Sequence, residues 1–244
     1  MLDDTLFFPS IDSTNLEAYR IRDQYAGKNI LLIAKEQTAG KGRLDRNWES
    51  KPGLGLWASL FLSRPEHLGC DLQYLSLLTG IVIQHAIRDL LGPQTQLKWP
   101  NDIMIGPRKC GGILTEIQWK GSEPASAIIG FGINLAHRPE DFSPQIREFS
   151  TSLSMVGATP PDSRMLAENI VDEFFDLFQL LDQTEDLVRV WNSLAWKLDE
   201  QVLWEQGTSK ITGRFQGVNR AGHAQILTDR GIETINAGEI RWTY

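Results

Sequence analysis

One polar segment of the chain carries side chains that could bind an anion. Residues 36–48 read EQTAGKGRLDRNW, so that Lys41, Arg43 and Arg46 stand among glycines. Glycine lets a backbone approach a ligand closely, and ammonium and guanidinium groups bind carboxylate and phosphate oxygens. The segment therefore predicts a loop that clamps an anion. It is neither a P-loop nor a dinucleotide fingerprint, because the glycine spacing of both motifs is absent.

Three further segments extend this chemistry. They read KWPND at residues 98–102, KCGGI at 109–113 and GFGIN at 130–134. Lys98 and Lys109 add positive charge, and KWPND sets an amide beside a carboxylate after a turn that proline favours. Taken singly, each lysine would usually be a solvated surface charge, and GFGIN could equally be a strand that ends in a turn.

The four segments, in this order and with this approximate spacing, resemble the signatures of the biotin protein ligases. Those signatures are a Gly-Arg-Gly-Arg-type loop, Lys-Trp-Pro-Asn-Asp, a lysine followed by Gly-Ile-Leu, and Gly-x-Gly-Ile-Asn. The resemblance begins at the Ser-Thr-Asn of residues 13–15 and reaches residues 217–222 and 238–240, which resemble the SH3-like module of that family. It therefore covers nearly the whole chain.

Two positions depart from the pattern of that family. Lys41 stands at the first arginine position of the loop, which keeps the charge but loses the planar, bidentate fork of a guanidinium. Asp45 stands where the family usually has glycine, and it adds a negative charge to a loop expected to bind anions. Both departures bear on how tightly the loop holds its ligand.

The resemblance implies an ATP-dependent ligase. Such an enzyme forms biotinyl-5′-AMP from biotin and ATP, releases pyrophosphate, and transfers biotin to a lysine of a biotin carboxyl carrier protein domain, as of acetyl-CoA carboxylase. The charge pattern agrees, because a carboxylate and an α-phosphate repel each other unless cations hold them together. Mg²⁺ is implied by the ATP chemistry, although the sequence shows no set of ligands for it.

The resemblance assigns the candidate residues to three roles. In catalysis, Lys109 would bridge the biotin carboxylate and the α-phosphate, Arg43 would clamp the same junction, and Asp102 would help to deprotonate or orient the carrier lysine. The expected biotin-binding residues are Ser13, Thr14, Asn15, Gln37, Lys41, Gly42, Arg43, Lys109 and Gly112. The expected ATP-binding residues are Arg43, Arg46, Trp48, Lys98, Asn101, Asp102 and Asn134.

Biotin itself predicts the character of its pocket. Its ureido ring needs short polar side chains, which residues 13–15 and Gln37 could supply, although Ser-Thr-Asn alone would indicate only a helix cap. Gly112, Gly130 and Gly132 would leave space on a sheet for the apolar bicycle. Trp48 could fold over the bound ligand as the loop closes.

The elements that must position these residues follow from hydrophobic periodicity. Helices are expected over residues 16–25, 71–91, 162–181 and 187–196, the second of them buried on several sides. Strands are expected over residues 29–34, 54–62, 96–99, 103–105, 113–119 and 127–133. After residue 198 the pattern changes to short β-prone pieces between turns. We therefore expect an α+β fold with a mixed sheet, class II synthetase-like, in a catalytic domain of residues 1–198, followed by an SH3-like β-barrel of residues 199–244.

Composition narrows the class of protein. The net charge of −7 argues against general binding to nucleic acid, and no apolar run approaches the roughly 20 residues of a membrane span. Cys70 and Cys110 are not in a CxxC pair, which argues against a disulfide framework and a zinc site. A cytoplasmic protein is expected. Because so little precedes Ser13, we expect no helix-turn-helix and no repressor role.

Two rival functions remain. A lipoate or octanoate protein ligase would have a related catalytic fold, but it should show Arg-Arg-x-x-Gly-Gly-Gly followed by His-Asp, a pattern not found here. A non-catalytic biotin-binding protein would need the pocket but not the cations. The sequence leaves the oligomeric state open, and a homodimer is possible. The four histidines are assigned no role.

Overall fold

The computed structural model describes residues 1–44, 46–64, 68, 74–91, 95–178, 184–206 and 208–242. The strands of the first sheet are β1 (Asp4–Phe8), β2 (Asn29–Ala34), β3 (Gly55–Leu62), β4 (Thr95–Lys98), β5 (Asp102–Ile105), β6 (Arg108–Lys120) and β7 (Glu123–Asn134). The helices are α1 (Thr14–Ile21), α3 (Tyr74–Leu91), α4 (Ser163–Leu177) and α5 (Thr184–Ser193), with short 3-10 turns at η1 (Pro139–Asp141) and η2 (Ser154–Val156). The C-terminal strands are β8 (Gln201–Gln206), β9 (Ser209–Val218), β10 (Ala224–Thr228), β11 (Gly231–Ile235) and β12 (Ile240–Trp242).

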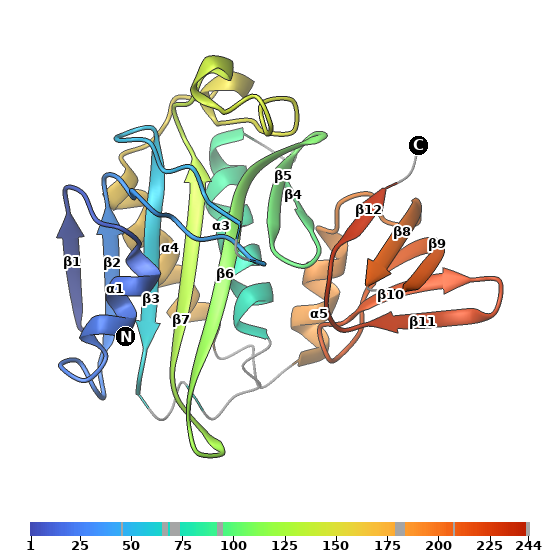
Figure 1. Ribbon diagram of the computed structural model, residues 1–244, viewed down its shortest axis with the longest axis horizontal. Coiled ribbons are helices and arrows are strands. Elements are labelled where there is room, and N and C mark those ends of the chain that lie inside the picture. The colour runs from blue at the N-terminus through green and yellow to red at the C-terminus, as the bar shows by residue number, and fades with distance from the viewer. Residues whose placement is uncertain are drawn as a thin grey trace.

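The first sheet has the order β1-β2-β3-β7-β6-β5-β4. β1 pairs in parallel with β2, and every other pair of neighbours is antiparallel, so the sheet is mixed as expected. Helices cover both faces, with α1 on one face and α3 and α4 on the other (Figure 1). All residues of β2 and β3 are buried, as strands covered on both sides must be.

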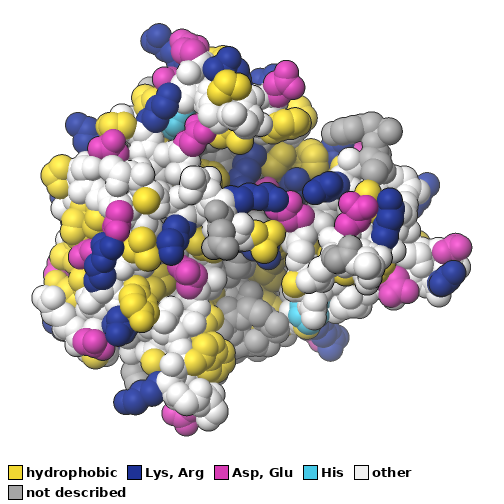
Figure 2. Space-filling view, in the orientation of Figure 1, with side chains coloured by type: hydrophobic (Ala, Val, Ile, Leu, Met, Phe, Trp, Pro, Cys, Tyr) yellow, Lys and Arg dark blue, Asp and Glu magenta, His cyan; other side chains and the backbone are white. Residues whose placement is uncertain are grey.

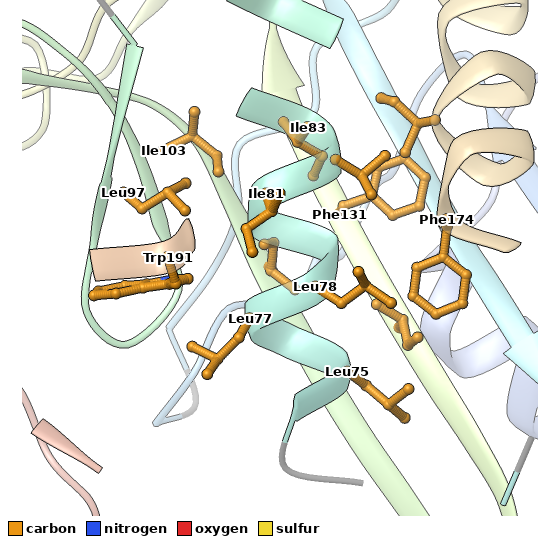
Figure 3. Close-up of a cluster of buried hydrophobic side chains, with 14 of the residues drawn as sticks. Leu75, Leu77, Leu78, Ile81, Ile83, Leu97, Ile103, Phe131, Phe174 and Trp191 are labelled. Carbon is orange, nitrogen blue, oxygen red and sulfur yellow. The ribbon is translucent and has the colours of Figure 1, made fainter. Parts of the chain in front are cut away.

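Helix α3 forms the centre of the larger core. Leu75, Leu78 and Val82 have no exposed surface, and Ile81 is 2% exposed. Figure 3 shows this helix surrounded by side chains from the sheet and from α4, among them Phe131 and Phe174. The expectation of a helix buried on several sides is confirmed, because apolar residues on all but a narrow stripe of α3 find partners.

The C-terminal strands form a separate antiparallel sheet of order β11-β10-β9-β8-β12. Phe215 and Ile226 are fully buried in it. Indole groups join this sheet to the rest: Trp99 Nε1 donates to the Gly222 carbonyl at 3.1 Å. The small C-terminal β unit expected from the sequence is therefore present, with β11 and β12 at the two ends of the described pairing order. The boundary after residue 198 stays a prediction.

Some expected elements differ in extent. The first helix ends at Ile21 rather than at residue 25, because the chain turns toward β2 there, with Gly27 at a φ of 75°. The strand expected at 113–119 begins earlier, at Arg108, and β1 was not expected at all. β1 is a half-exposed edge strand, and an edge strand carries a weak apolar pattern.

Other expectations fall outside the described residues: the start of the helix at 71–73, the end of the helix at 179–181, and the positions of Asp45, Cys70 and His67. Among the described helices, none combines the length and the hydropathy that a bilayer crossing needs.

Candidate active site

Every residue predicted for the site lines one pocket of about 520 Å³. These residues are Ser13, Thr14, Asn15, Gln37, Lys41, Gly42, Arg43, Arg46, Trp48, Lys98, Asn101, Asp102, Lys109, Gly112 and Asn134. Figure 2 shows a hollow between the larger and the smaller part of the molecule, with Lys and Arg side chains near it. The structure therefore brings together segments that are far apart in the sequence.

The anion loop is folded back on itself where β2 leads into β3. The Trp48 amide donates to the Gly40 carbonyl at 2.8 Å, and the Gly42 amide donates to the Arg46 carbonyl at 2.7 Å. A Cβ on Gly40 would lie 2.6 Å from the Trp48 carbonyl oxygen, so this fold of the loop needs glycine there. The backbone thus holds the cationic side chains of the loop against the pocket.

A polar network lies behind one end of the pocket, and those of its side chains that line the pocket are uncharged. Gln37 Oε1 accepts from the Thr14 amide at 2.8 Å. Ser59 Oγ lies 2.6 Å from Thr14 Oγ1 and 2.6 Å from Asn15 Oδ1, and Asn15 Nδ2 donates to Glu116 Oε2 at 2.7 Å. Ser59 and Glu116 were not predicted from the sequence, although a serine inside the apolar run of β3 could have signalled a buried polar contact.

Ser13 starts α1 without a side-chain cap hydrogen bond. It occupies the N-cap position with an extended backbone, and its side chain makes no cap hydrogen bond. The alternative interpretation of Ser13 as only a helix cap is therefore not supported by its side-chain contacts. Because Ser13 lines the pocket, its hydroxyl belongs to the polar end and not to the helix.

A charged centre lies beyond the polar end. Lys109 Nζ is 2.5 Å from Asp102 Oδ1 and 5.1 Å from the centre of the Trp48 ring. Burial lowers the pKa of the Arg43 guanidinium below its ordinary value, and the nearby carboxylates of Glu239 and Asp102 partly offset this effect. Lys109, Arg43 and Asp102, the three predicted catalytic residues, thus share one electrostatic neighbourhood.

The C-terminal sheet completes the wall of this centre. Arg46 forms a two-fold ion pair with Glu239, with Nη1–Oε1 at 2.5 Å and Nη2–Oε2 at 3.0 Å. Lys98 Nζ lies 5.7 Å from the Trp196 ring centre and 5.5 Å from that of Trp242. Glu239 and Trp242 were not placed in the site from the sequence, because only the folded chain brings residues after 198 to the loop.

The two predicted amides hold the pocket wall together. Asn101 Nδ2 donates to the Ile113 carbonyl at 2.5 Å, and the Ile113 amide donates back to the Asn101 carbonyl at 2.9 Å. Asn134 Nδ2 donates to the Thr151 carbonyl at 3.0 Å. Each side chain therefore already donates one N–H to the protein backbone. Only its other polar atoms can form hydrogen bonds with a ligand.

The side chains of Trp48 and Asn15 lie close above the glycines of the pocket. A Cβ on Gly132 would lie 2.6 Å from Trp48 Nε1, and a Cβ on Gly112 would lie 3.1 Å from the same ring. A Cβ on Gly130 would lie 2.1 Å from Asn15 Oδ1. All three glycines nevertheless line the pocket, so the expectation that they make room for a bicycle stays a prediction.

Two kinds of preformed centre, a reactive cysteine and a cluster of metal-ligating side chains, are not found in the described parts of the chain. Burial raises the pKa of the Cys110 thiol to about 12, which makes this cysteine a poor nucleophile. The described residues contain no group of three or more His, Cys, Asp and Glu side chains placed to hold a metal ion. The arrangement instead suits a reaction between two anionic groups held by cations.

Comparison with known proteins agrees with this geometry. Residues 7–134 match the Biotin/lipoate A/B protein ligase family, and residues 197–241 match the Biotin protein ligase C terminal domain. The chain is 30% identical over 237 residues to the bifunctional ligase/repressor BirA of Bacillus subtilis (strain 168), a match that covers 96% of this chain and 73% of that protein. The chain belongs to the biotin/lipoate A/B protein ligase family.

A second relative and a solved structure extend the comparison of this ligase. This chain is 29% identical over 244 residues to the biotin--[acetyl-CoA-carboxylase] ligase of Paracoccus denitrificans, and the match covers 94% of this chain and 96% of that protein. Its structure resembles the biotin protein ligase from Aquifex aeolicus in complex with biotin and ATP, with a TM-score of 0.83, 27% identity, and coverage of 99% and 100% of the two chains. The family and the ligase class expected from the sequence are confirmed.

Proposed function

We propose that this ligase forms biotinyl-5′-AMP from biotin and ATP and then transfers the biotinyl group to a lysine of a biotin carboxyl carrier protein domain of acetyl-CoA carboxylase. One observation carries the proposal: a single pocket joins an uncharged polar end to a cationic centre. Biotin has the same order of groups, a neutral ureido ring at one end and a carboxylate at the other. The similar Aquifex aeolicus structure, which is a complex with biotin and ATP, supports the two small-molecule substrates. The similar Paracoccus denitrificans protein, a biotin--[acetyl-CoA-carboxylase] ligase, supports the choice of carrier.

Biotin would lie with its ureido ring at the polar end. Ser13, Thr14 and Gln37 offer short polar groups there, and Asn15 is held by Ser59 and Glu116. The backbone around Lys41 and Gly42, together with Gly112, would contact the rest of the vitamin. A buried ureido group binds well only if its donors and acceptor are all paired, which is how such a site selects it.

The first step joins two anions. A carboxylate oxygen of biotin attacks the α-phosphorus of ATP, the new P–O bond forms, and the bond to the β-phosphate breaks so that pyrophosphate leaves. Lys109 would bridge the two reacting groups, and Arg43 would clamp the same junction. The Asp102 carboxylate, 2.5 Å from Lys109 Nζ, keeps that ammonium group in place. Fixed positive charge of this kind commonly contributes more to catalysis than any other single effect.

The nucleotide would occupy the side of the pocket nearer the C-terminal sheet. Arg46 and Lys98 would meet its phosphates, and Trp48 would cover the reacting groups and keep water away. Asn101, Asp102 and Asn134 complete the predicted nucleotide set. Mg²⁺ bound to a triphosphate keeps most of its waters and needs few protein ligands, so the Asp102 carboxylate would suffice as a protein contact.

The second step transfers biotin to the carrier. The lysine amine attacks the acyl carbon of the mixed anhydride, an amide bond forms, and AMP leaves with its phosphate oxygen. The amine can attack only without its extra proton, and Asp102 would accept that proton or orient the amine. The cytoplasmic location and the possible homodimer stay predictions.

Pyrophosphate release tests the proposed function. The purified protein is given MgATP with biotin, with lipoate or with no acid, and released pyrophosphate is counted. We expect pyrophosphate release when biotin is added with MgATP, and none with lipoate or without an acid. Release that requires lipoate would show a lipoate ligase instead, and biotin binding without any release would show a non-catalytic biotin-binding protein.

A further inference from the structure

Glu116 fixes the orientation of Asn15. It lies on β6, outside the pocket lining, and its Oε2 is 2.7 Å from Asn15 Nδ2. A carboxylate offers only acceptor oxygens, so the amide nitrogen of Asn15 must face it. The Asn15 oxygen therefore points the other way, where it lies 2.6 Å from Ser59 Oγ.

Ser59 passes this orientation on to Thr14. Its side chain has no exposed surface, and its hydroxyl has a single hydrogen. Because Asn15 Oδ1 has none, that hydrogen must go to Asn15. The 2.6 Å contact between Ser59 Oγ and Thr14 Oγ1 then needs the hydrogen of Thr14.

Thr14 is left with lone pairs alone for a ligand. Its other partner is Gln37 Oε1 at 3.1 Å, and that oxygen is an acceptor because it already receives the Thr14 amide hydrogen at 2.8 Å. The shorter contact, to Ser59 at 2.6 Å, takes the hydroxyl hydrogen of Thr14, so this hydrogen is used inside the protein. Thr14 Oγ1 can therefore only accept from a molecule in the pocket.

We propose that Glu116 is a positioning residue for substrate choice: its carboxylate sets the direction of a donor chain from Thr14 through Ser59 and Asn15, so that the pocket demands an N–H donor from its ligand. The proposal rests on the proposed function, since the ureido ring of biotin supplies such N–H groups. Bonds in such a chain polarise one another, and the chain ends on a charged acceptor.

Replacing the carboxylate by an amide should remove this direction. In Glu116→Gln the side chain keeps its size but can donate as well as accept. Asn15 can then turn over at the cost of its longer, 3.5 Å contact with the Leu114 carbonyl, and it can donate to Ser59, whose own hydrogen becomes free for Thr14. Ser59 would then no longer take the hydrogen of Thr14, and Gln37 Oε1, at 3.1 Å and already bonded to the Thr14 amide, would share it with an acceptor in the pocket, so the demand for a ligand N–H would weaken.

Calorimetric titration of three proteins tests the proposal. The proteins are the wild type, Glu116→Gln and the matched control Glu123→Gln, which removes an exposed carboxylate from β7, the next strand. The ligands are biotin and two cyclic carbamates in which one or the other ureido N–H is replaced by oxygen. The readout is the ratio of the carbamate Kd to the biotin Kd, which a loss of general stability would not move.

We expect the wild type and Glu123→Gln to share one high ratio, and Glu116→Gln to lower that ratio about tenfold for one of the two carbamates. Ser59→Ala, which cuts the chain without adding a donor, should weaken biotin itself. If the wild type binds biotin and Glu116→Gln keeps the wild-type ratio for both carbamates, the inference is wrong while the proposed function stands. If the wild type does not bind biotin, both fall.

Discussion

Gly130 lies directly beneath the Asn15 side chain, and we predict that Gly130→Ala cripples biotin binding. The added Cβ would lie 2.1 Å from Asn15 Oδ1 and 2.9 Å from its Cγ. Non-bonded atoms of this kind rest at about 3.5 Å, so the Asn15 side chain must retreat by more than about 1 Å. Its hydrogen bonds to Ser59 and Glu116, 2.6 and 2.7 Å long, would then break.

The loss can be estimated from these two bonds. A neutral hydrogen bond contributes about 1 kcal/mol net, and one to a charged group about 1.5 kcal/mol or more, so the polar end loses about 2.5 kcal/mol. If these hydrogen bonds must form for biotin to bind, the loss of about 2.5 kcal/mol in binding free energy raises the biotin Kd about 60-fold. Isothermal titration with biotin measures this directly.

Gly80→Ala provides the matched control. Gly80 lies inside helix α3. A Cβ added there would make only ordinary van der Waals contacts, the nearest with a Leu97 methyl group at 3.5 Å. Alanine favours a helix over glycine by about 1 kcal/mol, so this variant should unfold at a higher temperature with biotin binding unchanged. A Gly130→Ala protein that binds biotin within threefold of the wild type would refute the reasoning.

Three more predictions follow from the same geometry. Asp102→Asn given purified biotinyl-5′-AMP should transfer biotin to the carrier at least tenfold more slowly, and a wild-type transfer rate would remove Asp102 from that step. Biotin should protect the loop around Trp48 from protease, and equal cleavage with and without biotin would speak against loop closure. Burial lowers the pKa of His137, which is 1% exposed, so the unfolded state binds more protons just below pH 6.5 and stability must rise with pH there. Urea unfolding at pH 5.5 and 7.5 should therefore show a smaller stability difference in His137→Gln, and an unchanged difference would contradict this.

The cationic half of the site could be predicted because its residues lie in short segments with their own signature. Arg43, Lys98 and Lys109 were each expected to face an anion, and all three line the pocket. The central helix α3 was equally clear, because a long apolar stretch with few charges must be buried. Local pattern is sufficient where residue type and neighbours along the chain decide the outcome.

The supporting contacts could not be predicted, because they depend on which strands meet. Asn15 and Glu116 are 101 positions apart, and Arg46 and Glu239 are 193 apart. No local pattern connects such pairs. For the same reason, the positions of Asn15 over Gly130 and of Trp48 over Gly132 could not be predicted.

Single-turnover measurement of adenylate formation tests most directly whether the gathered cations join biotin to ATP. Rapid-quench mixing of enzyme, biotin and labelled MgATP would compare the wild type with Lys109→Ala, with Lys120→Ala as the control, since Lys120 is exposed at the far end of β6. We expect Lys109→Ala to form biotinyl-5′-AMP about 100-fold more slowly or worse, and the control to match the wild type. Adenylate formation at the wild-type rate without Lys109 would contradict the account.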